Sequence, residues 1–278
     1  MFSGSLGRHT SIGFLGTHQK FNRTAFRLMK HVVRWPYNDA RSNAKLAKFP
    51  SIRDIQSFEG SKGPDGLKYN KQTKSEPPHF YNPKSKDNKA FFEILSEHYA
   101  NLVTALKKKD MEKAAFEASW LAHTITDGLT PAHHFPYEQE IQNARGKSRE
   151  QTTSTSSKLI TKGDGLRDTL RRNWQIIGRK GTLTTHTNFE AGVGVAMLMI
   201  KLPPQRISGI ELAFARTEGA EELFKVMAES ISDLNMYERF YKHGWTFSLI
   251  RDVRFFLAPT TAKTISLIWL IALEESMA

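Results

Sequence analysis

Apolar residues recur every three or four positions along most of the chain, which is the spacing of one face of an α-helix. The strongest pattern covers residues 88–127 and is broken by the basic turn KKKD, so it predicts two helices joined at Lys109 and Asp110. Further periodic runs predict helices over residues 19–33, 188–200, 219–236 and 261–275, with a short one over 166–177. No run alternates with the two-residue period of strands. The pattern therefore predicts an all-α, multi-helix fold.

Two long polar segments interrupt the helical pattern. Residues 40–82 are rich in Gly, Pro, Ser and Lys, and a loop of that length in a compact domain is normally functional or disordered. Residues 139–181 carry scattered Arg and Lys and are expected to form a basic surface insertion. With 278 residues and no internal repeat, the chain is expected to form one domain over residues 1–278.

The apolar stretch TISLIWLIAL, between Lys263 and Glu274, has a length that suits a buried terminal helix. A stretch of ten residues is too short to span a bilayer, so no transmembrane segment is expected. The N-terminal stretch lacks an apolar core followed by a small-residue cleavage site. We therefore expect a cytoplasmic protein from this chain as it stands, or a secreted one if an export segment lies outside it.

The net charge and the cysteine content limit the partners and the metal ligands that this protein can use. Forty Lys and Arg against twenty-eight Asp and Glu give a formal charge of +12, which favours anionic partners and peripheral contact with anionic surfaces, although simple solubility would explain it equally well. The chain has no cysteine, which excludes thiolate metal sites, disulfides and cysteine nucleophiles. Any metal ion must be held by His, Asp, Glu or backbone groups.

The stretch LAHTITDGLTPAHH concentrates three histidines, one aspartate and one proline. His123 and Asp127 are four residues apart, so on a helix they share one face and can bind the same cation. Gly128 is expected to end the helix, and Pro131 prevents its continuation, which returns His133 toward the helix end. A single His-x-x-x-Asp pair is more often an ordinary hydrogen bond than a metal site.

A second pair with the same spacing, His186 and Glu190 in HTNFE, strengthens the metal interpretation. Two such pairs and a turn histidine supply the nitrogen and oxygen donors that Zn²⁺ binds at about 2.0–2.2 Å.

The pattern His-x-x-x-Asp-x-x-x-Pro-x-His resembles the signature of the zinc-dependent phospholipase C and single-strand nuclease superfamily. The segments KKKDMEKAAFEASWLAH, HFYNPKSKDNK, GTHQKFNRTAF and HTNFE resemble corresponding segments of the bacterial phospholipases C, and residues 262–274 resemble their closing helix. These matches are spread from residue 18 to near the C-terminus, so the resemblance covers nearly the whole chain.

The resemblance implies a compact all-α domain with zinc ions in a cleft. One zinc ion would use His79, His123 and Asp127, together with an aspartate from the preceding loop; Asp54 sits in the more similar context and is favoured over Asp65, whose separation from His79 is closer to the family's. A second zinc ion would use His133, His186 and Glu190. A third zinc ion would bind His18, and Asp127 would bridge this ion and the first one. The family's N-terminal Trp ligand has no counterpart before His18, so two or three ions are expected.

The resemblance also implies hydrolysis of a phosphodiester by metal-activated water, with Asp54 orienting or deprotonating that water. The expected substrate is a phospholipid head group. Nucleic acid is the alternative substrate, as in the nuclease branch, and a non-catalytic zinc-binding relative is a third possibility. The absence of cysteines and the HFYNP and KKDMEKA segments favour the phospholipase branch.

Overall fold

A computed structural model describes residues 16–34, 39–59, 63–64, 80–85, 87–135, 137–145, 163–199 and 205–278. Every regular element within these ranges is a helix, and no strand occurs in them, which confirms the all-α prediction. In chain order the helices are α1 (Thr17–Arg34), α2 (Ala40–Leu46), α3 (Ile52–Glu59), α5 (Lys89–Lys107), α6 (Met111–Leu129), η1 (Pro131–His134), α7 (Tyr137–Arg145), α9 (Leu166–Ile177), α10 (Thr182–Met199), α11 (Gly209–Ser232), α12 (Met236–His243), α13 (Phe247–Asp252), η2 (Val253–Leu257) and α14 (Ala258–Glu275).

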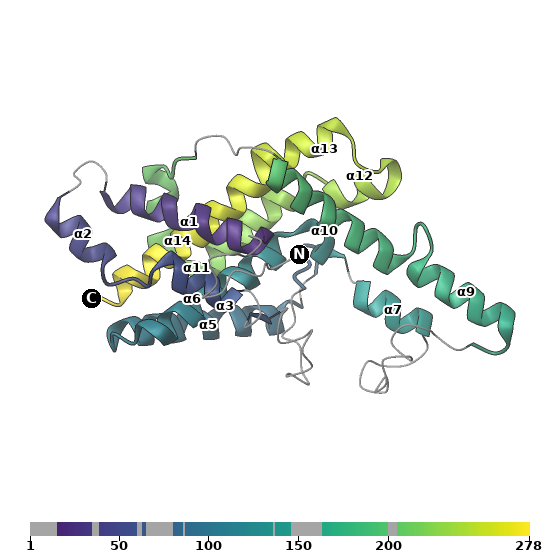
Figure 1. The fold of residues 1–278 in the computed structure, drawn as a ribbon, viewed down its shortest axis with the longest axis horizontal. Coiled ribbons are helices and arrows are strands. Elements are labelled where there is room, and N and C mark those ends of the chain that lie inside the picture. The colour runs from purple at the N-terminus through teal and green to yellow at the C-terminus, as the bar shows by residue number, and fades with distance from the viewer. Residues whose placement is uncertain are drawn as a thin grey trace.

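The core is built around α14, which runs through the middle of the bundle in Figure 1. Nearly all of its side chains are buried, and α1, α11, α6 and α5 pack against it. The Trp269 indole N–H donates to the carbonyl of Ala118 at 3.1 Å, which ties α14 to α6. The apolar C-terminal stretch is thus the central core helix, as its length predicts.

By length and composition alone, the continuous helical stretch Phe247–Glu275 would be long and apolar enough to cross a membrane. However, 83% of its most apolar window is buried inside the protein. A core helix of this kind passes such a test because its neighbours supply the apolar surroundings that lipid would otherwise provide.

The predicted helical hairpin over residues 88–127 is confirmed as α5 and α6. Asp110 caps α6 by accepting from the backbone N–H of Lys113 at 3.0 Å, and Lys109 takes a left-handed φ of 58° in the turn. Residues 40–82 were expected to be loop, but α2 and α3 lie within them. The turn residues between these short helices hid their periodicity.

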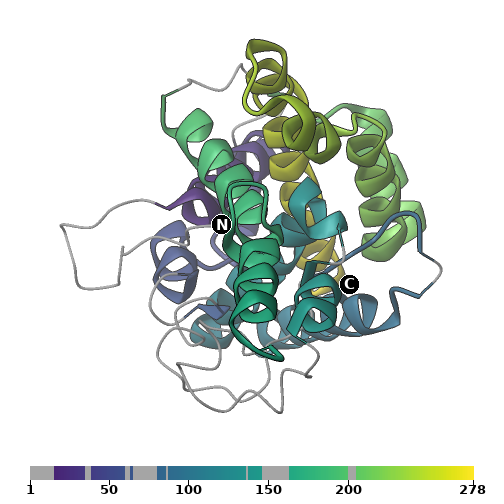
Figure 2. The same cartoon turned by 90° about the vertical axis from the view of Figure 1, so that its right-hand side faces the viewer.

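The expected insertion over residues 139–181 lies partly outside the described residues. Its described parts are the end of α7 and the whole of α9, whose observed bounds equal the predicted ones. Helix α9 lies at one end of the molecule and faces the viewer in Figure 2.

A buried carboxylate between α5 and α6 gives a test of the packing. Glu117 is 1% exposed and lies 2.6 Å from His98 Nδ1 and 2.7 Å from Lys113 Nζ. Burial alone would raise its pKa, but the hydrogen bonds from His98 and Lys113 outweigh burial and lower the pKa below its usual value. The ionised carboxylate therefore stabilises the fold above the unfolded pKa of about 4.3, and this stabilisation is lost as the pH falls through the folded pKa.

We expect Glu117→Gln to lower the free energy of unfolding by about 2 kcal/mol at pH 7, because a charge-assisted hydrogen-bond pair is lost. The difference from wild type should shrink below about pH 4. Urea unfolding followed by circular dichroism at both pH values measures it. Glu97→Gln, an exposed change on α5, is the control. A difference that stays constant with pH would contradict the ionised role of Glu117.

Candidate metal centre

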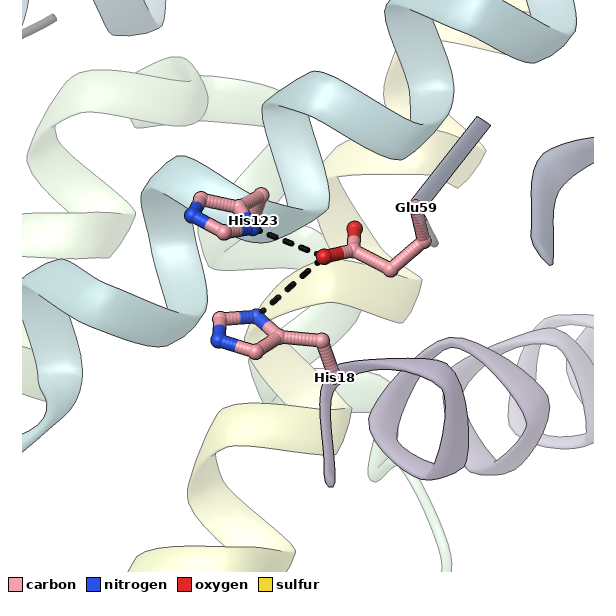
Figure 3. A group of neighbouring side chains, drawn as sticks. All are labelled: His18, Glu59 and His123. Carbon is pink, nitrogen blue, oxygen red and sulfur yellow. Dashed lines mark hydrogen bonds and ion pairs between the residues drawn. The ribbon is translucent and has the colours of Figure 1, made fainter. Parts of the chain in front are cut away.

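Three buried side chains from separate helices form the first cluster: His18 of α1, Glu59 of α3 and His123 of α6 (Figure 3). One carboxylate oxygen, Glu59 Oε1, lies 2.7 Å from His123 Nδ1 and 3.7 Å from His18 Nδ1. The two imidazole rings stack nearly parallel, with centroids 4.2 Å apart. Both histidines therefore present the same edge to Glu59.

Reciprocal hydrogen bonds between α1 and α3 place this cluster. Gln19 Nε2 donates to the carbonyl of Gln56 at 2.8 Å, and Gln56 Nε2 donates to the carbonyl of Gln19 at 2.9 Å. These bonds lie one residue from His18 and three from Glu59. They fix the start of α1 against the end of α3 and hold the histidine and the carboxylate at a set separation.

Asp127 lies at the opposite edge of the same two rings. Its Oδ1 is 3.3 Å from His18 Nε2, and its Oδ2 is 3.2 Å from His123 Nε2. Both imidazoles are thus held between two carboxylates, with Glu59 facing the Nδ1 atoms and Asp127 facing the Nε2 atoms. The four-residue spacing on α6 brings His123 and Asp127 together, as the sequence predicts.

The second cluster is formed by His133 of η1 with His186 and Glu190 of α10. Glu190 Oε1 lies 2.7 Å from His133 Nε2 and 3.2 Å from His186 Nε2. Asp127 Oδ1 is 3.9 Å from His133 Nε2, so this aspartate lies between the two clusters. The Phe80 ring stacks on His133 with centroids 5.2 Å apart, which brings part of the HFYNP segment to the site.

The end of α6 sets the position of His133. Helix α6 continues one residue beyond Gly128, which therefore does not end it as predicted. A Cβ at Gly128 would lie 2.4 Å from the Phe91 ring and 2.7 Å from the Phe224 ring, so close packing requires the glycine. Thr130 then caps the helix and Pro131 begins η1. His134 Nε2 donates to the carbonyl of Gly128, and burial lowers the pKa of this histidine to about 4.

Asp127 and Glu190 are ionised at neutral pH. Burial would raise the pKa of Asp127, but His133 and His123 outweigh burial and hold it well below its usual value. Burial likewise opposes ionisation of Glu190, yet hydrogen bonds from His133 and His186 contribute to a lowered pKa. Burial would lower the pKa of His123, and the charges of Glu59 and Asp127 reverse this and raise it. A metal ion that binds His123 must therefore displace a proton.

The donor sets fit a metal ion. Three donors around one zinc ion at 2.0–2.2 Å lie about 3.4 Å apart. In each cluster, one donor atom from every residue lies within 4.8 Å of the others, so small side-chain adjustments would suffice. Both ring nitrogens of His18 are buried and make no hydrogen bond within the described part of the chain. Buried imidazole nitrogens of this kind are costly unless a proton donor, an acceptor or a metal ion satisfies them.

The structure does not bring Asp54 into either cluster. Ser51 Oγ donates to Asp54 Oδ2 at 2.7 Å and accepts from the Asp54 backbone N–H at 3.2 Å, so this pair closes the first turn of α3. Glu59, which the sequence reasoning missed, occupies the cluster instead. The signal for it was a charged residue on the apolar face that Ile52 and Ile55 begin. His79 and Asp65 lie outside the described residues.

No family model matches the chain, and no curated protein matches its sequence. Among solved structures, the fold is similar to the crystal structure of the Clostridium perfringens alpha-toxin isolated from an avian strain, with a TM-score of 0.58 and 13% sequence identity. The match covers 95% of this chain and 64% of the toxin chain, so this chain spans about two thirds of the toxin's length. At this identity the similarity concerns the all-α fold.

Proposed function

We propose that this protein is a zinc-dependent phosphodiester hydrolase, and specifically a phospholipase C that cleaves phospholipid head groups. The observation that carries the proposal is the pair of buried His and carboxylate clusters with Asp127 between them. The sequence places their members on five separate helices, and the fold gathers them at one location. The helical fold similar to that of alpha-toxin supports the same interpretation.

The proposed ligands follow the two clusters. His18, Glu59 and His123 would hold one ion, and His133, His186 and Glu190 would hold another, with Asp127 near both. We assign to Glu59 the carboxylate role that the sequence resemblance gave to Asp54. His79 remains a proposed ligand on the basis of the resemblance alone.

The reaction requires charge stabilisation and an activated water molecule. Zinc ions, when bound, polarise phosphoryl oxygens and lower the pKa of a bound water molecule toward about 7. The protein's own contribution is to keep Asp127 and Glu190 ionised and to bury the imidazoles away from bulk water. A buried site of this kind strengthens electrostatic interactions with a phosphodiester anion.

The test measures the zinc content of the protein and its hydrolysis of a substrate together. We expect two zinc ions per chain by elemental analysis, and hydrolysis of a chromogenic phosphocholine ester. A chelator should lower this hydrolysis by at least about 10³-fold, because metal catalysis supplies several kcal/mol of transition-state stabilisation and each 1.36 kcal/mol is a factor of ten. Added Zn²⁺ should restore it.

The outcomes separate the branches of the superfamily. Hydrolysis of single-stranded DNA with no hydrolysis of the ester would replace the phospholipase with a nuclease. Bound zinc without turnover of either substrate would leave a non-catalytic metal-binding protein. Full activity in chelator-treated, metal-depleted protein would overturn the metal assignment itself.

A further inference from the structure

Helix α9 exposes its apolar side chains. Leu166 is 78% exposed, Leu170 63%, Trp174 71% and Ile177 55%. Ile176 is the buried residue of this helix, which packs against α10 and α7. A surface helix of a globular protein normally buries its apolar face, so α9 shows the reverse arrangement.

The four exposed side chains form one stripe, which we call the α9 stripe: Leu166, Leu170, Trp174 and Ile177. Their spacings of four, four and three residues place them within about a quarter of the helix circumference, because a helix turns once every 3.6 residues. Partly buried Thr169 and Arg172 lie on the side of the helix that carries the buried Ile176. The stripe is therefore contiguous, unlike singly scattered exposed apolar residues, which need no explanation.

Positive charge flanks the α9 stripe. Arg167, Arg171, Arg179 and Lys180 are exposed in this helix and in the turn after it. The acidic residue of the helix, Asp168, is paired with Arg171 at 2.7 Å and with Arg172 at 2.6 Å. The surface beside the stripe is thus cationic, which complements an anionic partner.

We propose that the α9 stripe docks the protein on an anionic phospholipid surface. A helix with Leu and Trp on one face and Arg beside them lies in a membrane interface, with the apolar side chains inserted and the cations on lipid phosphates. Trp174 suits this position because indole combines an apolar ring with a polar N–H. Three of the four stripe residues are aliphatic, which favours lipid over single-stranded nucleic acid, since bases stack on aromatic rings.

The stripe is connected to the metal centre by a short path. The turn Gly178 to Gly181 joins α9 to α10, and His186 lies in the second turn of α10. Lys180 lies over the Tyr241 ring at 5.5 Å, which fixes this turn against α12. The choice of lipid as partner rests on the proposed function, but docking itself does not require hydrolysis.

The experiment uses the full zinc-loaded chain and sedimentation with vesicles. Vesicles of phosphatidylglycerol and phosphatidylcholine should bind the protein, and vesicles of phosphatidylcholine alone should bind it more weakly. The double variant Leu170→Gln, Trp174→Gln should bind the anionic vesicles at least roughly tenfold more weakly, because two inserted side chains are lost. Its hydrolysis of the soluble phosphocholine ester should equal wild type.

Ile210→Gln is the matched control, since Ile210 is 82% exposed but lies on α11. Equal vesicle binding by the double variant and this control would overturn docking through α9. Two other results would also overturn docking on lipid through α9. If the double variant lost self-association in the absence of lipid, the partner of the stripe would be a second copy of the chain. If the wild type did not bind vesicles and the double variant lost binding to single-stranded DNA, the partner would be nucleic acid. If neither the wild type nor any variant hydrolysed the ester, the proposed function would be wrong, and vesicle binding would stand as an independent result.

Discussion

Asp127→Asn should abolish most of the activity and at least one bound zinc ion. Asp127 contacts His18 and His123 in one cluster and approaches His133 in the other, so a single change weakens both. Asparagine keeps the size of the side chain but removes the negative charge that a pair of divalent ions needs. We expect hydrolysis of the soluble phosphocholine ester to fall by about 10³-fold or more, since losing about 4 kcal/mol of stabilisation corresponds to that factor.

The matched control is Asp110→Asn at the other end of α6. Asp110 caps the helix, and asparagine caps nearly as well as aspartate, so zinc content and activity should stay at wild-type values. Elemental analysis and ester hydrolysis on both purified variants measure the contrast. If Asp127→Asn kept two zinc ions and activity within about threefold of wild type, the shared position of Asp127 would have no functional meaning.

The helical periodicity of the sequence was enough to predict most of the fold. The hairpin of α5 and α6 follows from a long amphipathic pattern and a basic turn, and α9 from a short run bounded by glycines. Helices α2, α3, α12 and α13 escaped prediction because six to eight residues give too few repeats of a 3.6-residue period. The same shortness explains why residues 40–82 were predicted to be loop throughout.

The candidate site was predictable where it depends on local spacing. His123 with Asp127, and His186 with Glu190, each share one helix, so the four-residue interval places them together. The approach of His18 to His123 depends on the packing of α1 against α6, and only the family resemblance pointed to it. Glu59 was missed because that resemblance called for an aspartate and Asp54 stood in the more similar context. Its participation depends on how the end of α3 packs between α1 and α6.

The contrast between Glu59 and Asp54 gives a second decisive test. Glu59→Gln should lower the zinc content by one ion and the activity by about 10²-fold or more, because its carboxylate faces both imidazoles and a neutral amide binds cations poorly. Asp54→Asn should change neither quantity and should cost only about 0.5–1 kcal/mol of stability, since Asp54 closes the first turn of α3.

Zinc content, ester hydrolysis and urea unfolding, measured on the two variants side by side, separate a ligand from a capping residue. The two variants are compared because Asp54 and Glu59 are both acidic and lie on one short helix. A general loss of charge or a disturbed α3 would therefore affect both variants alike. A selective loss in Glu59→Gln means that the end of α3 supplies the carboxylate. A selective loss in Asp54→Asn would return that role to Asp54 and would require α3 to turn its first helical turn toward His123 when metal binds.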